Sequence, residues 1–130
     1  LWLQNGGEWI ASSNPASWSG WFEQIAQLPI AMQLEGKDGK QYGLLHADFP
    51  SDDWADYADF NQEELETCLW SRRNFAQRAT HSVAGIDYLV HGHNSTDHEV
   101  DGKSEALQLG NRLYMEPAAY KGKSFIILAI

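Results

Sequence analysis

The apolar residues follow a helical spacing early in the chain. Five of them recur at the three- and four-residue intervals of one helix face: Trp18, Trp21, Phe22, Ile25 and Leu28. Asn14 and Pro15 precede this run, and such a pair caps a helix and fills its first turn. The pattern therefore predicts a helix that ends at Leu28 and Pro29, because the residue before a proline is disfavoured in helical geometry.

Residues 30–35 and 41–46 form two short strand-like runs, and Asp38-Gly39 between them is a strong hairpin signal. Residues 51–60 fit neither period and predict a loop with one helical turn. Asn61 should then cap a second helix with acidic residues in its first turn and arginines toward its end. Its buried stripe should comprise Leu65, Cys68, Leu69 and Phe75.

From Gly85 onward the pattern changes to strands. Runs over 86–90, 105–115 and 124–130 are strand-like, a polar stretch covers 94–103, and turns are expected at Gly110-Asn111 and over 121–123. Helices come early and strands late, so the sequence predicts an α+β fold with helices outside a sheet.

Size and composition limit the function classes. The 130 residues suit one domain, and 43% hydrophobic residues with six tryptophans can fill a core. No apolar run approaches the ~18 residues that span a bilayer, so we expect no membrane segment. Cys68 is the single cysteine, which favours a reducing, cytoplasmic setting. A net charge of −9 argues against general nucleic-acid binding and suits a site for cations.

Two histidines follow apolar runs, His46 after Leu44-Leu45 and His93 after Val90-His91-Gly92. Neutral imidazole is the commonest protein ligand for transition metals, so two strand-end histidines are a candidate metal site. Each could instead be an ordinary strand-end residue. His91 is expected to be structural and not to chelate a metal together with His93.

Arg72 stands between the two histidines in Trp70-Ser71-Arg72-Arg73. An arginine beside a buried tryptophan at a helix end is suited to bidentate binding of a phosphate or carboxylate. The alternative is an arginine that only complements the helix dipole. The acidic residues over 52–59 lack the glycine and glutamate of a calcium loop, and Cys68 should belong to the core.

Five segments in order resemble the C-terminal half of bacterial and phage serine/threonine phosphatases of the phosphoprotein phosphatase family, which are calcineurin-like metallophosphoesterases. The segments are residues 5–7 (NGG), 45–50 (LHADFP), 69–73 (LWSRR), 90–93 (VHGH) and 111–115 (NRLYM). The order and approximate spacing agree over nearly the whole chain. Each segment is weak evidence alone, whereas five in sequence are strong.

The resemblance implies that the chain is the C-terminal portion of a four-layer α/β/β/α sandwich with two divalent metal ions, manganese or alternatively iron or zinc. It implies that His46 and His93 bind one of these metals and that Arg72 binds the substrate phosphate. The GDxHG, GDxxDRG and GNHE motifs of the family are not in this sequence. We therefore expect a partial domain over 1–130, a piece of a longer protein, which alone is nearly inactive.

Two departures bear on the substrate. The family's GHTP becomes Gly92-His93-Asn94-Ser95, and its late Asp-Thr-Gly-Ala becomes Glu116-Pro117-Ala118-Ala119. A phosphoprotein or a small phosphorylated molecule is the expected substrate, with dinucleoside tetraphosphates as the alternative. A different alternative is a non-catalytic remnant that binds a partner or phosphorylated ligand through Arg72 and the acidic loop. The missing half should also leave apolar edges exposed, through which this chain could associate.

Overall fold

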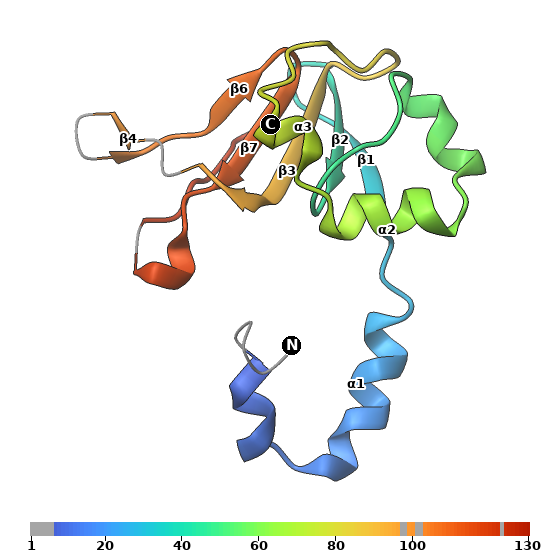
Figure 1. Ribbon diagram of the computed structural model, residues 1–130, viewed down its shortest axis with the longest axis vertical. Coiled ribbons are helices and arrows are strands. Elements are labelled where there is room, and N and C mark those ends of the chain that lie inside the picture. The colour runs from blue at the N-terminus through green and yellow to red at the C-terminus, as the bar shows by residue number, and fades with distance from the viewer. Residues whose placement is uncertain (1–6, 97–98, 101–102, 123) are drawn as a thin grey trace.

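The computed structural model describes residues 7–96, 99–100, 103–122 and 124–130. Its centre is a five-stranded sheet in the order β1-β2-β3-β7-β6. The strands are β1 (Ala31–Glu35), β2 (Gln41–Leu45), β3 (Tyr88–Ser95), β6 (Leu107–Leu109) and β7 (Arg112–Glu116). A separate two-stranded sheet pairs β4 (Glu99–Val100) with β5 (Lys103–Ser104) and projects beyond the larger one (Figure 1). The chain is thus a mixed α+β structure, as predicted.

The inner strands of the sheet are parallel and the outer pairs are antiparallel. β2 pairs with β3 and β3 with β7 in parallel, while β1 and β6 form hairpins with β2 and β7. Both hairpin turns agree with the sequence prediction, at Asp38-Gly39 and at Gly110-Asn111. Gly110 has a φ of 61°, and an added Cβ there would lie 2.3 Å from the Thr80 carbonyl oxygen, so only glycine fits this turn.

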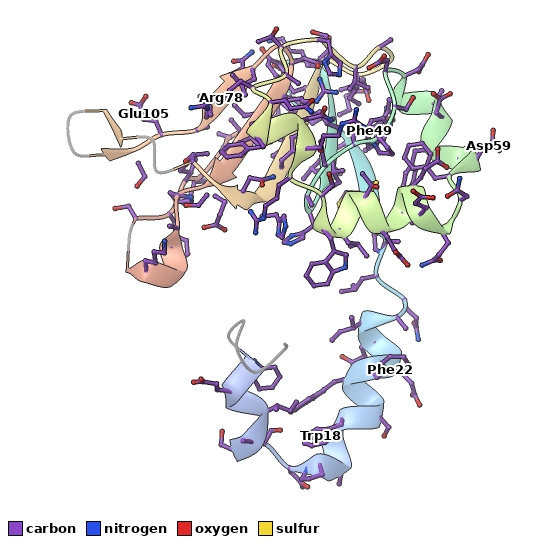
Figure 2. All side chains as sticks on the ribbon, viewed as in Figure 1. Trp18, Phe22, Phe49, Asp59, Arg78 and Glu105 are labelled. Atoms are coloured by element: carbon purple, nitrogen blue, oxygen red, sulfur yellow. The ribbon has the colours of Figure 1, made fainter. Side chains whose placement is uncertain are left out.

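Helical segments between β2 and β3 cover one face of the sheet: the 3₁₀ helix η4 (Trp54–Asp59), α2 (Gln62–Trp70) and α3 (Arg73–Ala76) (Figure 1). The core between the two layers includes Leu45, Phe49, Trp54, Cys68 and Leu89. Figure 2 shows Phe49 between the sheet and these helical segments. An added Cβ at Gly43 would lie 2.9 Å from the Trp54 ring, so a glycine in mid-strand lets the indole pack flat on the sheet.

The second helix begins as predicted but ends early. Asn61 accepts hydrogen bonds from the N–H groups of Glu63 and Glu64, and the Glu64 side chain accepts from the Asn61 N–H, which completes a capping box. The helix ends at Trp70 because Ser71 is extended, with ψ of 146°. Phe75 therefore belongs to the separate helix α3, and the prediction of one helix through that residue is wrong. Cys68 is fully buried, as predicted.

The N-terminal segment forms an arm that lies away from the sheet (Figure 1). It comprises the 3₁₀ helices η2 (Gly7–Ser12) and η3 (Pro15–Ser17), followed by α1 (Trp18–Ile25). Asn14 caps η3, as the sequence predicts, although α1 ends at Ile25 rather than at Leu28. No residue of α1 is buried, and Figure 2 shows Trp18 and Phe22 far from the sheet. The NGG segment at residues 5–7 lies largely outside the described residues.

The last residues depart from the prediction, because 124–130 has no strand. A 3₁₀ helix, η5 (Ala119–Lys121), precedes this irregular segment. Its Leu128 and Ile130 line a pocket with Tyr42, Leu44, Val90 and Met115 on the sheet face opposite α2. The apolar side chains of this segment therefore contact the face of the sheet, and the segment does not pair with a strand edge. None of the described helices is long and apolar enough to cross a membrane.

Candidate functional site

His46 and His93 come together at one end of the parallel strands. Leu45 lies opposite His91 in the sheet, and the Gly92 N–H donates to the His46 carbonyl oxygen over 3.1 Å. The imidazole rings of His46 and His93 consequently lie with their centroids 4.8 Å apart. Parallel strands deliver their carboxyl ends to the same sheet edge, which is why two residues distant in sequence become neighbours.

The backbone of His93 departs from strand geometry. Its φ is 57°, in the left-handed region that non-glycine residues seldom adopt, and the β3–β7 register is irregular between His91 and Ser95. The His93 Nε2 lies 3.2 Å from the Trp70 carbonyl oxygen. Because a carbonyl only accepts, Nε2 carries a hydrogen, and the neutral ring keeps its lone pair on Nδ1. Metal-binding histidines commonly have this arrangement.

Burial lowers the pKa of His93, and the positive charge of Arg72 and the neighbouring His46 act in the same direction. All three effects disfavour a proton on the second ring nitrogen. The neutral imidazole is the form that can bind a metal ion.

Arg72 stands at the junction of α2 and α3, next to this pair. Its Nη1 donates to the His93 carbonyl oxygen over 2.8 Å and to the Asn94 Oδ1 over 3.1 Å. Within the part of the chain that the structure describes, its Nε and Nη2 have no protein acceptor. The guanidinium is therefore anchored at one nitrogen and open at the others.

The tryptophan before Arg72 is not buried, contrary to the prediction. Trp70 is 72% exposed at the last position of α2. Its ring meets the His93 ring edge to face at a centroid distance of 6.3 Å. The apolar support expected for Arg72 is thus absent on this side, and hydrogen bonds to His93 and Asn94 hold the guanidinium instead.

The sequence prediction assigned no separate role to Asp48, which the structure makes a central residue. It is 2% exposed, and its carboxylate accepts four hydrogen bonds, two of them from Asn74. The other donors are the Ser71 hydroxyl and the Phe49 N–H. The sequence signal was present in the His46-Ala47-Asp48 spacing, but only the fold shows which donors the acid meets.

His91 is buried behind the pair, in agreement with its predicted structural role. It is 1% exposed, donates from Nδ1 to the Ala47 carbonyl oxygen over 2.8 Å, and stacks on Tyr114 with ring centroids 4.7 Å apart. Burial lowers the pKa of His91 to about 4 and raises that of Tyr114 to about 12. Both groups are therefore neutral at physiological pH.

Arg112 is a buried cation that the sequence prediction left without a role. It is fully buried, and Nη1 donates to the His81 carbonyl oxygen while Nη2 lies 3.1 Å from the His81 Nε2. His81 Nε2 in turn lies 3.2 Å from the Asp52 carboxylate. This cluster ties β7 to the loop before β3 and lies apart from the His46–His93 pair.

A polar cavity of about 590 Å³ lies beside α2 and α3, and its lining includes Asp48, Ser71 and Arg73. His46, His93 and Arg72 do not line it. The three predicted site residues gather instead at the strand ends, so the cavity does not mark their position. Proximity of the side chains is the better guide to chemistry here, because a metal needs converging ligands rather than a large volume.

The two imidazoles are suitable metal donors, but they form only part of a coordination shell. Among the residues that the structure describes, no group of three or more His, Cys, Asp or Glu side chains could hold a metal ion. Asp48 cannot complete the set, since its two oxygens already accept two hydrogen bonds each. Among the described residues, the two imidazoles are therefore the donors that this part of the structure offers.

Comparison with known proteins adds no family assignment, because neither a protein-family model nor a curated protein matches this chain.

Proposed function

We propose that this chain supplies two metal ligands and a phosphate-binding arginine to a metal-dependent phosphomonoester hydrolase, a serine/threonine phosphoprotein phosphatase. The observation that carries the proposal is the closeness of the His46 and His93 rings, at 4.8 Å between centroids, with Arg72 bonded to the His93 carbonyl. The resemblance of five ordered segments to that family supports it. The further ligands would come from residues outside these 130.

His46 and His93 act as nitrogen donors to one divalent ion, manganese or alternatively iron or zinc. His93 keeps its ring fixed through Nε2 and Trp70, so its Nδ1 lone pair has a defined direction. A divalent ion held by these rings supplies Lewis acidity toward water and phosphoryl oxygens. A lone pair held in a fixed direction on His93 lowers the ordering cost of binding that ion.

Arg72 binds the phosphoryl group. Nη1 is occupied by His93 and Asn94, while Nε and Nη2 have no acceptor among the described residues and can bind two phosphate oxygens. Charge spreads over the equatorial oxygens in phosphoryl transfer, and a fixed guanidinium stabilises it. Anchoring at Nη1 places the donors before substrate arrives, which reduces the entropy lost on binding.

The chain alone should hydrolyse phosphomonoesters at close to the uncatalysed rate. This reaction is among the slowest known without catalysis, so it requires a complete charge-stabilising centre. Two imidazoles and one guanidinium provide a fraction of it. If the 130-residue chain with Mn²⁺ hydrolysed p-nitrophenyl phosphate at rates typical of complete enzymes, this would contradict the proposal that it carries only part of the catalytic centre.

The decisive experiment uses the polypeptide encoded by the whole reading frame that contains these residues. We expect Mn²⁺-dependent phosphate release from a phosphoserine peptide, reduced by about 10²-fold or more in His93→Ala and in Arg72→Ala. His81→Ala is the matched control, because His81 pairs with Asp52 and Arg112 away from the site. If the polypeptide cleaved diadenosine tetraphosphate in preference to the phosphopeptide, the proposed substrate class would change. If it hydrolysed neither substrate with Mn²⁺, Fe²⁺ or Zn²⁺, the proposed hydrolase activity would be refuted and the non-catalytic binding role would be favoured.

A further inference from the structure

We propose that Asp48 is the positioning residue for Arg72: its carboxylate fixes the junction between α2 and α3 on which the arginine stands. The inference rests on the phosphate-binding role proposed above for Arg72. Asp48 itself touches neither substrate nor metal in this scheme.

Asp48 accepts three of its four hydrogen bonds from residues on the two sides of Arg72. Oδ2 accepts from the Ser71 hydroxyl over 3.2 Å and from the Asn74 N–H over 2.9 Å. Oδ1 accepts from the Asn74 side-chain amide over 2.7 Å and from its neighbour Phe49 N–H over 2.9 Å. Three of the four donors therefore belong to the residues that flank Arg72, and one carboxylate holds both ends of the segment.

Asp48 adds to the local hydrogen bonds at this junction, in which the Ser71 N–H donates to the Thr67 carbonyl oxygen, the Ala76 N–H to the Arg72 carbonyl oxygen and the Arg73 N–H to the Ser71 Oγ. Ser71 is extended and Arg72 has φ of −122° and ψ of 11°, so the helical hydrogen-bond ladder is interrupted between α2 and α3. The first N–H groups of a helix need acceptors from outside it, and Asp48 provides one for α3 at Asn74. A buried carboxylate with four donors is fully satisfied, and removal of its charge leaves those donors underpaired.

The same turn also carries His46. The Ala47 N–H donates to the Cys68 carbonyl oxygen over 2.8 Å, and the Ala47 carbonyl accepts from His91 Nδ1 over 2.8 Å. Residues 46–48 thus join the first candidate ligand, helix α2 and strand β3. Arg72 links this group to the second candidate ligand, because its Nη1 donates to the His93 carbonyl oxygen. Asp48 consequently sets the place of the guanidinium relative to both imidazoles.

The test compares Asp48→Asn with Asp53→Asn in the 130-residue chain. The asparagine is isosteric but presents an NH₂ group to donors that need an acceptor. Asp53 is the matched control, because it is exposed, accepts one backbone hydrogen bond at the start of η4, and loses the same charge. Two NMR readouts are used: the Arg72 Nε–H resonance with its NOEs to His93 and Asn94, and the affinity for inorganic phosphate.

We expect Asp48→Asn to shift and broaden the Arg72 Nε–H resonance, weaken its NOEs to Asn94, and lower phosphate affinity about tenfold, whereas Asp53→Asn changes none of these. The double variant Asp48→Asn/Asn74→Asp exchanges the two partners and should restore part of the signal. Ser71→Ala removes a single donor and should give a smaller shift in the same direction, which keeps the test valid if Asp48→Asn does not fold.

Two outcomes separate this inference from the proposed function. An unchanged Arg72 resonance with unchanged NOEs in a less stable Asp48→Asn, and in Ser71→Ala, would overturn the positioning role and leave Asp48 a stability residue. Absence of phosphate binding by the unsubstituted chain would count against the role of Arg72, while the resonance and NOEs would still decide whether Asp48 positions the guanidinium.

Discussion

The imidazole rings of His46 and His93 lie with their centroids 4.8 Å apart at the ends of the parallel strands β2 and β3. The register of the sheet produces this contact, because Leu45 and His91 are the last pair between β2 and β3, His46 follows directly, and β3 continues through His93 to Ser95 with an irregular register. The Gly92 N–H bond to the His46 carbonyl fixes the two turns against each other.

The pair should bind a transition metal measurably even without the remaining ligands. We expect calorimetry with Zn²⁺ or Ni²⁺ to give an affinity that His93→Ala lowers by at least about tenfold, since loss of outer-shell partners alone costs 10–100-fold. His81→Ala should leave it unchanged, because that ring lies in the Arg112 and Asp52 cluster. Equal affinities for all three chains would show that the two rings do not act together.

Arg78→Gly should stabilise the fold. Arg78 is exposed and has φ of 53° just after α3, where glycine avoids a steric cost of about 1 kcal/mol. Arg73→Gly removes the same charge at a helical position and should instead destabilise by about 0.5–1 kcal/mol. Urea unfolding of the three chains measures both changes, and a shift of the same sign in both variants would contradict the backbone argument.

Stability should fall at alkaline pH through Cys68. Burial, followed by the charges of Asp48 and Glu64, raises the pKa of the thiol to about 11 from 9.0 in the unfolded chain. The folded state therefore keeps the thiol proton to a higher pH than the unfolded chain does. The contribution of the protonated thiol to stability is complete below pH 9 and is lost as the pH rises toward 11. At pH 10.5 the loss relative to pH 8 should be about 2 kcal/mol.

Cys68→Ala provides the control for this pH dependence. Urea unfolding at the two pH values should show a larger loss in the unsubstituted chain than in Cys68→Ala, because all other titrating groups are shared. The same burial should make Cys68 react slowly with a thiol reagent in the folded state. An equal pH-dependent loss in both chains would remove the thiol as its cause.

The chain should self-associate through its apolar edge. Met32 is 45% and Leu34 40% exposed on β1, which is an edge strand of the sheet. Leu34→Lys should shift sedimentation-velocity profiles toward monomer, since charged residues on an edge oppose pairing. Gln62→Lys adds the same charge on exposed α2 and should have little effect. A monodisperse monomer of the unsubstituted chain with a cooperative melt would contradict this expectation.

Much of the local structure could be predicted from the sequence. Asn14 and Asn61 cap helical segments because their side chains accept the first free N–H groups, and this depends on residues two or three positions away. Asp38-Gly39 and Gly110-Asn111 form hairpin turns for similarly local reasons. Conversely, 124–130 is apolar like a strand but has none, and its Leu128 and Ile130 contact the face of the sheet instead of pairing with a strand edge.

For the candidate site, the residue types and their positions after apolar runs were enough to single out His46, His93 and Arg72. How these residues meet follows from the folded chain. The parallel register brings the two rings together, the break after Trp70 turns Arg72 toward the His93 carbonyl, and Asp48 is buried among donors from α3. Such contacts depend on segments far apart in the chain, whose pairing no local pattern encodes, whereas caps and turns are set by neighbouring residues alone.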